Sequence, residues 1–348
     1  MTISEILEHS GAHALIYDVG RGLNRLSPTL FAAVEAQQLP YPYPQQGNAQ
    51  LAICFYAQAN QPFIWFLQLP LDEQGLLDNA LRDNFCEALL NALGVNALGE
   101  QLTTDLGETQ QQQLNQHPAL FTPTQTQQAA LNATLKLVLE QPPSIHFEYA
   151  QAYLQAPQTL DWEQLGLQGL HDVAARLTLA DSAAERLTGA MMKGFANYPA
   201  SVQQALVVAL EPYQLPPSLS QYFIGLWQQA DPATDTAALA LRALANNVDP
   251  ALIPPLQQRL QSELTLNQNE LIVLVTRHAA LIAQQQLLAP LLAQIAAQPE
   301  ALALGLFEDL VRQPQVRASV LTWLSQADHR ASLPTPLQTA LATLKGMP

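Results

Sequence analysis

The chain has 348 residues, of which 49% are hydrophobic and only 12% are charged. Acidic side chains outnumber basic ones by 29 to 14, which gives a formal net charge of −15. Proteins that bind nucleic acid or anionic membranes rely on clustered Lys and Arg to contact phosphates, and here the basic residues are scattered from Arg21 to Lys345. The composition therefore predicts no nucleic-acid partner and no membrane partner.

The N-terminal residues and the two cysteines indicate the cellular location and the redox state of the protein. The first residues, MTISEILEHSGAH, carry acids where a secretory signal has basic residues, and no stretch reaches the roughly 18 apolar residues of a membrane span. We therefore expect a cytoplasmic protein. Cys54 and Cys86 lie in apolar segments, which favours two buried thiols over a disulfide, and two cysteines are too few for a structural zinc site. We expect no metal and no cofactor.

The first third of the chain mixes strand and helix patterns. Residues 14–19 (ALIYDV), 51–58 (LAICFYAQ) and 62–69 (PFIWFLQL) are rich in β-branched and aromatic side chains, and the last two are close enough to form a hairpin. Ser27-Pro28 predicts a helix start, because Ser accepts hydrogen bonds from free amides and Pro suits the first turn. We expect that helix to extend to about residue 38.

A long helix is predicted after the hairpin. Apolar residues recur at spacings of three and four from Leu76 to Leu93, and Gly94 is a suitable end. Asp72 and Glu73 would favour its start through the helix dipole. Together these elements predict a small α/β (α+β) module over residues 1–121, with the Gln-rich stretch 99–121 as its boundary, either a helix or a linker.

The rest of the chain, residues 122–348, carries almost no strand pattern. Apolar residues in 237–248 and 252–264 fit helical faces on each side of Asp249-Pro250, which predicts a helix hairpin, and the run 281–295 is expected to be a helix that is apolar on more than one side. The breaks between runs recur near multiples of 33 to 35 residues: Pro199, Pro232, Asn267, Pro299 and Pro334. This period predicts a mainly α fold, a HEAT-like right-handed α-solenoid of helix pairs, with a compact helical bundle as the alternative.

Several short motifs resemble one known family. They are IYDVGRG at 16–22, Asn24-Arg25 through Ser27-Pro28, YPYP at 41–44 and LAICF at 51–55. Together they resemble an uncharacterised gammaproteobacterial domain-of-unknown-function family that spans essentially the whole chain. The resemblance implies a bacterial cytoplasmic protein and brings no activity, cofactor or catalytic residue. The helical portion, separately, is similar in architecture to HEAT repeats.

One local cluster of unlike polar groups follows the first expected strand. Its members are Asp18, Arg21, Asn24 and Arg25, with Gly20 and Gly22 between them. Two arginines in such a loop can hold a phosphate or a carboxylate through paired hydrogen bonds; alternatively Asp18 pairs with the arginines and pins the loop. The loop lacks the third glycine of a dinucleotide fingerprint and the Lys of a phosphate-binding loop. The four polar residues are therefore candidate binding residues, and no catalytic residue is predicted.

Two aromatic features complete the candidates. The YPYP segment at 41–44 is either a stiff connector whose tyrosines pack on the module or a polyproline ligand for another protein. Trp65, Trp162, Trp227 and Trp323 are expected to be core anchors, whereas a Trp exposed in a groove of the helical array would indicate a binding hot spot.

Two functions remain in competition. The leading hypothesis is a non-enzymatic interaction protein whose helical array binds another protein, with a basic partner favoured by the acidic chain. The alternative is a small-molecule-binding protein or enzyme with a site around Asp18, Arg21 and Arg25. A HEAT-like DNA glycosylase is disfavoured because cations are sparse in the helical region. The oligomeric state is left open.

Overall fold

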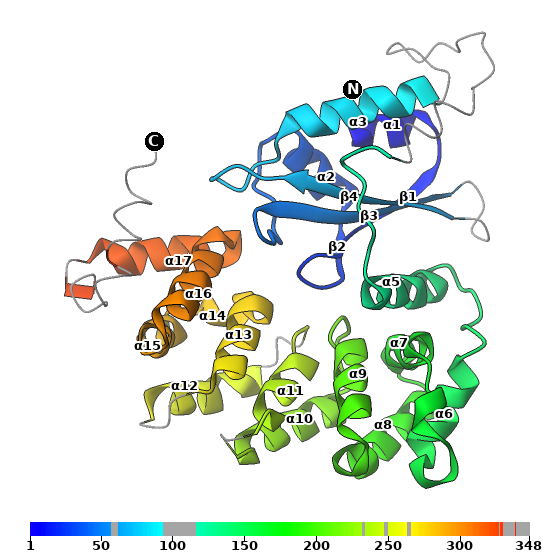
Figure 1. Cartoon of the computed structure of the whole chain (residues 1–348), viewed down its shortest axis with the longest axis vertical. Helices are drawn as coiled ribbons and strands as arrows, with labels where there is room; N and C mark the ends of the chain where they lie inside the picture. Colours follow the sequence, from blue (N-terminus) through cyan, green and yellow to red (C-terminus); the bar gives the residue numbers. More distant parts are fainter. Residues whose placement is uncertain are drawn as a thin grey trace. The chain divides into compact units, whose positions relative to one another are not determined.

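The computed structural model, drawn in Figure 1, describes residues 1–56, 62–92, 116–231, 234–246, 250–262, 266–326, 328–329 and 338. Within these ranges the protein is mainly helical and has one small antiparallel sheet near its N-terminus. The chain forms two compact units, Met1–Gln127 and Gln128–Pro348. The division falls inside helix α5 (Gln125–Val138), beyond the end of the module expected at residue 121. Most of the Gln-rich stretch expected as the boundary lies outside the described residues.

The first unit is built on an antiparallel sheet in which the described strands are ordered β2-β1-β3-β4. The strands are β1 (His13–Asp18), β2 (Asn24–Leu26), β3 (Asn48–Tyr56) and β4 (Phe63–Pro70). β3 and β4 pair with Leu51 opposite Leu67 and Ile53 opposite Trp65, so the predicted hairpin is confirmed. β2 was not predicted, because its three residues Asn-Arg-Leu carry too little β-branched or aromatic character to signal a strand.

Helices α1 (Ile3–His9), α2 (Pro28–Glu35) and α3 (Asn79–Ala92) bury their apolar sides in one core with alternate residues of the strands. α2 begins as predicted, since the Ser27 hydroxyl accepts the Leu30 amide at 3.1 Å. α1 was missed, although its Thr2 and Glu5 form a capping box that the sequence TISE signals.

The predicted start of α3 needs a correction. Asp72 does not open a helix; its carboxylate accepts the amides of Gln74 and Leu76, each at 2.8 Å, and closes a turn. Asp78 then accepts the Ala80 amide at 2.9 Å, and the helix begins at Asn79. Asp72 thus stabilises a turn and Asp78 starts the helix, because the short carboxylate of aspartate can accept nearby backbone amides in both settings. The expected end at Gly94 lies outside the described residues.

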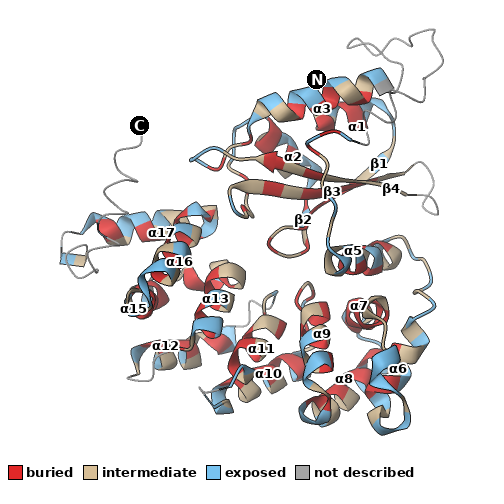
Figure 2. Ribbon diagram, in the orientation of Figure 1, coloured by how far each residue is buried: buried red, intermediate tan, exposed pale blue. Residues whose placement is uncertain are grey.

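The second unit is an array of helices joined by short turns. One set of helices makes contacts in succession from the first to the last: α7 (Leu167–Arg176), α9 (Ala200–Leu210), α11 (Thr236–Ala243), α13 (Gln268–Arg277) and α16 (Glu300–Arg312). The other described helices that follow α5 are α6 (Phe147–Gln155), α8 (Ser182–Gly194), α10 (Pro217–Gln229), α12 (Ile253–Gln261), α14 (Ala279–Ile282), α15 (Gln285–Ala296) and α17 (Pro314–Ser325). Among these, α6 contacts α8, α8 contacts α10, and α12 contacts α15. Figure 2 shows that these helices carry buried and exposed residues on different sides.

Polar contacts fasten these helices at a nearly regular sequence separation. Rings or amides of buried side chains reach backbone carbonyls 37, 38 and 34 residues away: His278 to Leu241, Gln313 to Val275 and Gln294 to Leu260. Helices start at the predicted breaks that the structure describes, with Pro199 and Pro299 as N-caps of α9 and α16. Pro232 and Pro334 lie outside the described residues. At Asn267, where the break lacks proline, a capping box with Glu270 starts α13 instead.

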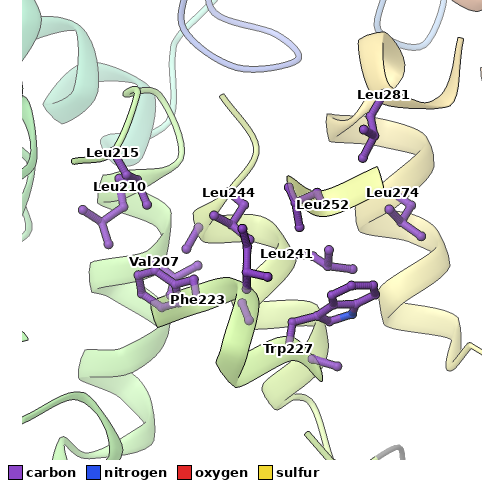
Figure 3. Close-up of a cluster of buried hydrophobic side chains, with 14 of the residues drawn as sticks. Val207, Leu210, Leu215, Phe223, Trp227, Leu241, Leu244, Leu252, Leu274 and Leu281 are labelled. Atoms are coloured by element: carbon purple, nitrogen blue, oxygen red, sulfur yellow. The ribbon is translucent and has the colours of Figure 1, made fainter. Parts of the chain in front are cut away.

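One hydrophobic core runs through the second unit, and Figure 3 shows part of it around Trp227, Phe223 and Leu241. The expected single helix over 281–295 is wrong, because α14 ends at Ile282 and α15 begins at Gln285. In a continuous helix Leu281 would lie close to Leu288 and Leu292, whereas Ile282 would lie roughly 150° from the middle of the apolar stripe of the next turns. The break turns both segments toward the same core, where Leu281, Ile282 and Leu288 are all buried.

Candidate functional site

Asp18 is the centre of a buried hydrogen-bond network in the first unit. Its side chain is fully buried at the end of β1, and its carboxylate accepts the Tyr41 hydroxyl at 2.7 Å and the Asn24 amide at 3.1 Å. The backbone amides of Gly20 and Arg21 also donate to it. Burial raises the pKa of Asp18 to about 6, while the hydrogen bonds from Tyr41 and Asn24 act to lower that pKa.

The two arginines of the predicted cluster have different positions. Arg21 is buried, and its guanidinium donates to the backbone carbonyl of Pro44 through Nε at 2.9 Å and also through an Nη atom. Arg25 is exposed and lies opposite Tyr17 in the β1–β2 pair. Side chains alternate between the two faces of a sheet, so Arg25 shares a face with Tyr17 and not with Asp18 or Asn24.

This network joins the loop after β1 to the YPYP segment. Tyr41 is fully buried and donates a hydrogen bond to Asp18, and the Pro44 carbonyl accepts hydrogen bonds from Arg21. The segment therefore acts as the stiff connector that was one of the two interpretations of the sequence. The hydrogen bonds that the Asp18 carboxylate accepts are donated by other groups of the protein itself. Tyr41 is the member that sequence reasoning did not assign to the cluster, because it lies 23 residues away.

The second unit contains an open groove of about 820 Å³ between the end of α6 and the length of α8. After α6 the chain makes two 3-10 turns, η1 (Pro157–Thr159) and η2 (Trp162–Gln164), and these form one wall. The other wall is α8 with the 3-10 turn η4 (Phe195–Asn197). α6 and α8 are neighbours in the helical unit, coloured green in Figure 1.

The α8 wall presents two basic side chains and no acidic one. Arg186 and Lys193 line the groove, both are exposed, and they are seven residues apart on α8. Seven residues are almost two complete helical turns, so both side chains emerge on the same side of the helix. Over the parts of the chain that the structure describes, neither makes an ion pair or a hydrogen bond.

The opposite wall carries an exposed tryptophan. Trp162 retains 40% of its surface exposed, whereas Trp227 in the core of the same unit is 0% exposed. The prediction that Trp162 is a core anchor is therefore wrong. The spacing of tryptophans in the sequence could not distinguish the exposed Trp162 from the buried Trp227. The signal that could have found it is local, since Trp162 follows Asp161 in a Pro-containing and Gln-containing stretch without helical periodicity.

Gly189 lines the groove and faces open space. A Cβ built on Gly189, midway between Arg186 and Lys193, would meet nothing within 4 Å. Behind the groove the hydroxyl of Tyr198 donates to the Leu154 carbonyl at 2.9 Å and so ties the two walls together. Gly194 packs directly on that tyrosine. A cationic, amide-lined and aromatic surface of this kind suits a ligand that has both anionic and apolar groups.

Two further observations limit the chemistry. Among the described residues, no group of three or more His, Cys, Asp or Glu side chains is placed to hold a metal ion. No helix in the described part of the chain has the length and apolar character needed to cross a membrane. Cys54 and Cys86 are both buried and unpaired, as expected, and burial raises the pKa of the Cys54 thiol to about 11.

The fold and the groove together define a protein with a small α+β unit and a larger helical unit that offers an open, partly cationic surface. Residues 1–345 match the family described as protein of unknown function DUF3549, and the chain belongs to this family. No curated protein and no solved structure shows significant similarity to the chain.

Proposed function

We propose that this protein is a non-enzymatic interaction protein of the bacterial cytoplasm that binds another protein through the groove between α6 and α8. The helical unit would serve as a HEAT-like right-handed solenoid of helix pairs, in which each pair stacks on the next. The regular separation of its interhelical hydrogen bonds and the succession of helix contacts support this arrangement.

The exposure of Trp162 in the groove is the observation that carries the proposal. Tryptophan and arginine dominate the energetics of protein interfaces, and here Trp162 and Arg186 line the same surface. The lining supplies no acid or nucleophile in a catalytic arrangement, and a binding role fits it better.

We do not propose the alternative site around Asp18, Arg21 and Arg25. The Asp18 carboxylate accepts hydrogen bonds from Tyr41 and Asn24 and is fully buried, and Arg25 lies on the other face of the sheet. A ligand would have to break the network that positions the loop. The geometry therefore favours a structural role for Asp18 and its partners.

The proposal is tested with full-length protein and two matched glycine variants. Gly189→Phe places a ring in the groove, and Gly305→Phe places one on an exposed part of α16, where a Cβ also meets nothing within 4 Å. Wild type and both variants are cross-linked in native extract, and the cross-linked residues are identified by mass spectrometry. We expect a partner whose cross-links map to α6 and α8 in wild type and in Gly305→Phe and are lost in Gly189→Phe. Identical cross-links from all three proteins would overturn the proposal.

A further inference from the structure

We propose that the groove between α6 and α8 binds an extended acidic segment of a partner protein. In this arrangement two carboxylates of the segment pair with Arg186 and Lys193, and an apolar side chain between them packs on Trp162. The inference rests on the proposed function and adds the chemistry of the partner.

The charge of the lining argues for an acidic occupant. Arg186 and Lys193 are the charged residues of the lining, and among the described residues their side chains have no carboxylate partner of their own. Asp161 lies beside Trp162 in the sequence, but its carboxylate accepts the Glu163 amide at 3.0 Å and caps η2. Two unpaired cations in a partly enclosed groove attract carboxylates at short range, even though the chain as a whole has a net charge of −15.

The spacing of the cations argues for an extended segment. Seven residues of α8 separate Arg186 from Lys193 by about 10 Å along the helix axis. In a polyproline II segment, residues three apart lie on the same edge and are about 9 Å apart. Acidic residues at positions i and i+3 of such a segment therefore match the two cations. A Cβ on Gly189 would meet nothing within 4 Å, so the backbone of the segment has room to approach α8.

The opposite wall argues for an apolar side chain. Trp162 and Pro157 present apolar surface across the groove from the cations, and Gln155 and Gln158 add amide groups beside them. A side chain at i+2 of the segment leaves the edge that carries the carboxylates and faces this wall. Side-chain amides of the wall can hydrogen-bond to the exposed backbone of a polyproline II segment, which forms no hydrogen bonds of its own.

The probe for the test is the blocked peptide acetyl-Gly-Asp-Pro-Phe-Asp-Pro-Gly-amide, which has aspartates at i and i+3. Two control peptides replace both aspartates with asparagine or with lysine. Binding to the full-length protein is measured by calorimetry and by tryptophan fluorescence, and Trp162→Phe assigns the fluorescence change. We expect the aspartate peptide to bind at least about fivefold more tightly than the asparagine peptide, and the lysine peptide to bind more weakly still.

Variants of the groove test the contacts one at a time. Arg186→Gln and Lys193→Gln remove exposed charges without disturbing the core, and each should weaken binding of the aspartate peptide by roughly threefold, with roughly tenfold for the double variant. Gly189→Phe should abolish binding, and Gly305→Phe should leave it unchanged. Equal affinity for the aspartate and asparagine peptides, or no binding of the aspartate peptide at millimolar concentration, would overturn the inference.

Other ligands define the remaining outcomes. Inorganic phosphate, succinate and a short single-stranded DNA are tested in the same way. If one of them binds at the groove more tightly than the aspartate peptide, the ligand of the groove is a small anion or a nucleic acid, and the inference is contradicted. The cross-linking experiment separates this failure from failure of the proposed function. Suppose that the cross-links are lost in Gly189→Phe but are unchanged in Arg186→Gln and Lys193→Gln. That result would support the proposal that the groove binds a protein and would overturn the inference that the bound segment is acidic.

Discussion

The hydroxyl of Tyr198 donates a hydrogen bond of 2.9 Å to the backbone carbonyl of Leu154, 44 residues earlier in the chain. Both residues are buried, and burial raises the pKa of Tyr198 well above its usual value, so the hydroxyl keeps its proton. The bond joins the last turn of α6 to the segment that follows α8. It thereby sets the distance between the two walls of the groove.

Removing this hydroxyl tests the contact directly. Tyr198→Phe leaves a buried carbonyl without its side-chain donor, and we expect a loss of about 1–2 kcal/mol in the free energy of unfolding. Urea denaturation of both proteins provides the measurement. Tyr222→Phe is the control, because no described residue bonds to the half-buried Tyr222 hydroxyl. An equal effect of the two substitutions would contradict the importance of the Tyr198 bond.

Two glycines of α8 should respond oppositely to alanine. A Cβ on Gly194 would lie 2.6 Å from the Tyr198 hydroxyl oxygen, so Gly194→Ala should lower the melting temperature and cost about 1–3 kcal/mol. A Cβ on Gly189 meets nothing within 4 Å, and Gly189→Ala should stabilise the helix by up to about 1 kcal/mol. Calorimetric unfolding compares the two variants. The same sign for both would show that packing on Tyr198 does not control Gly194.

His171 is fully buried in α7, and among the described residues neither ring nitrogen has a hydrogen-bond partner. Desolvation lowers its pKa to about 4, below the ordinary value of 6.5. Because the unfolded chain binds a proton at this histidine between those values and the folded protein does not, stability falls as the pH drops from about 6.5 to 4. Replacing the ring with leucine removes this contribution. We therefore expect His171→Leu to stabilise the protein by about 2 kcal/mol more at pH 5 than at pH 7.5.

The measurement for His171 is a pair of urea titrations at the two pH values. Asp18 acts in the opposite direction over the same window, since its pKa is raised to about 6 and its folded form gains a proton as the pH falls. His278, whose pKa is lowered to about 4, adds to the effect of His171. Both groups are present in wild type and variant, so the difference between the two proteins isolates His171. A difference that is independent of pH would refute the assignment.

The Asp18–Tyr41 hydrogen bond should depend on the charge of Asp18. Tyr41→Phe removes the donor that lowers the pKa of Asp18, and the pKa should rise above about 6. The cost should be about 1–3 kcal/mol at pH 7.5, where the buried carboxylate is charged, and smaller at pH 5, where the folded carboxyl is protonated. Chemical denaturation at both pH values checks this. Tyr43→Phe, at a half-buried tyrosine whose hydroxyl makes no hydrogen bond with a described residue, is the matched control.

Local elements of the fold were readable from the sequence because their causes are local. Ser27-Pro28 starts α2 through a bond that spans three residues, and the apolar runs of β3 and β4 pair across a short connection. The proline breaks at Pro199 and Pro299 start helices for the same reason. The helix break after Ile282 was not readable, since it serves the alignment of two apolar stripes toward a shared core.

The candidate groove, like the fold, depends partly on local sequence and partly on tertiary contacts. Arg186 and Lys193 were not predicted as site residues, because the sequence shows only two cations seven residues apart, which is an ordinary spacing for one exposed side of a helix. Only the tertiary structure puts Trp162 on the facing wall, because its position depends on the turns after α6 and on the Tyr198–Leu154 bond. Charge, hydrophobic pattern and capping act over a few residues, whereas a groove depends on contacts between segments that are distant along the chain.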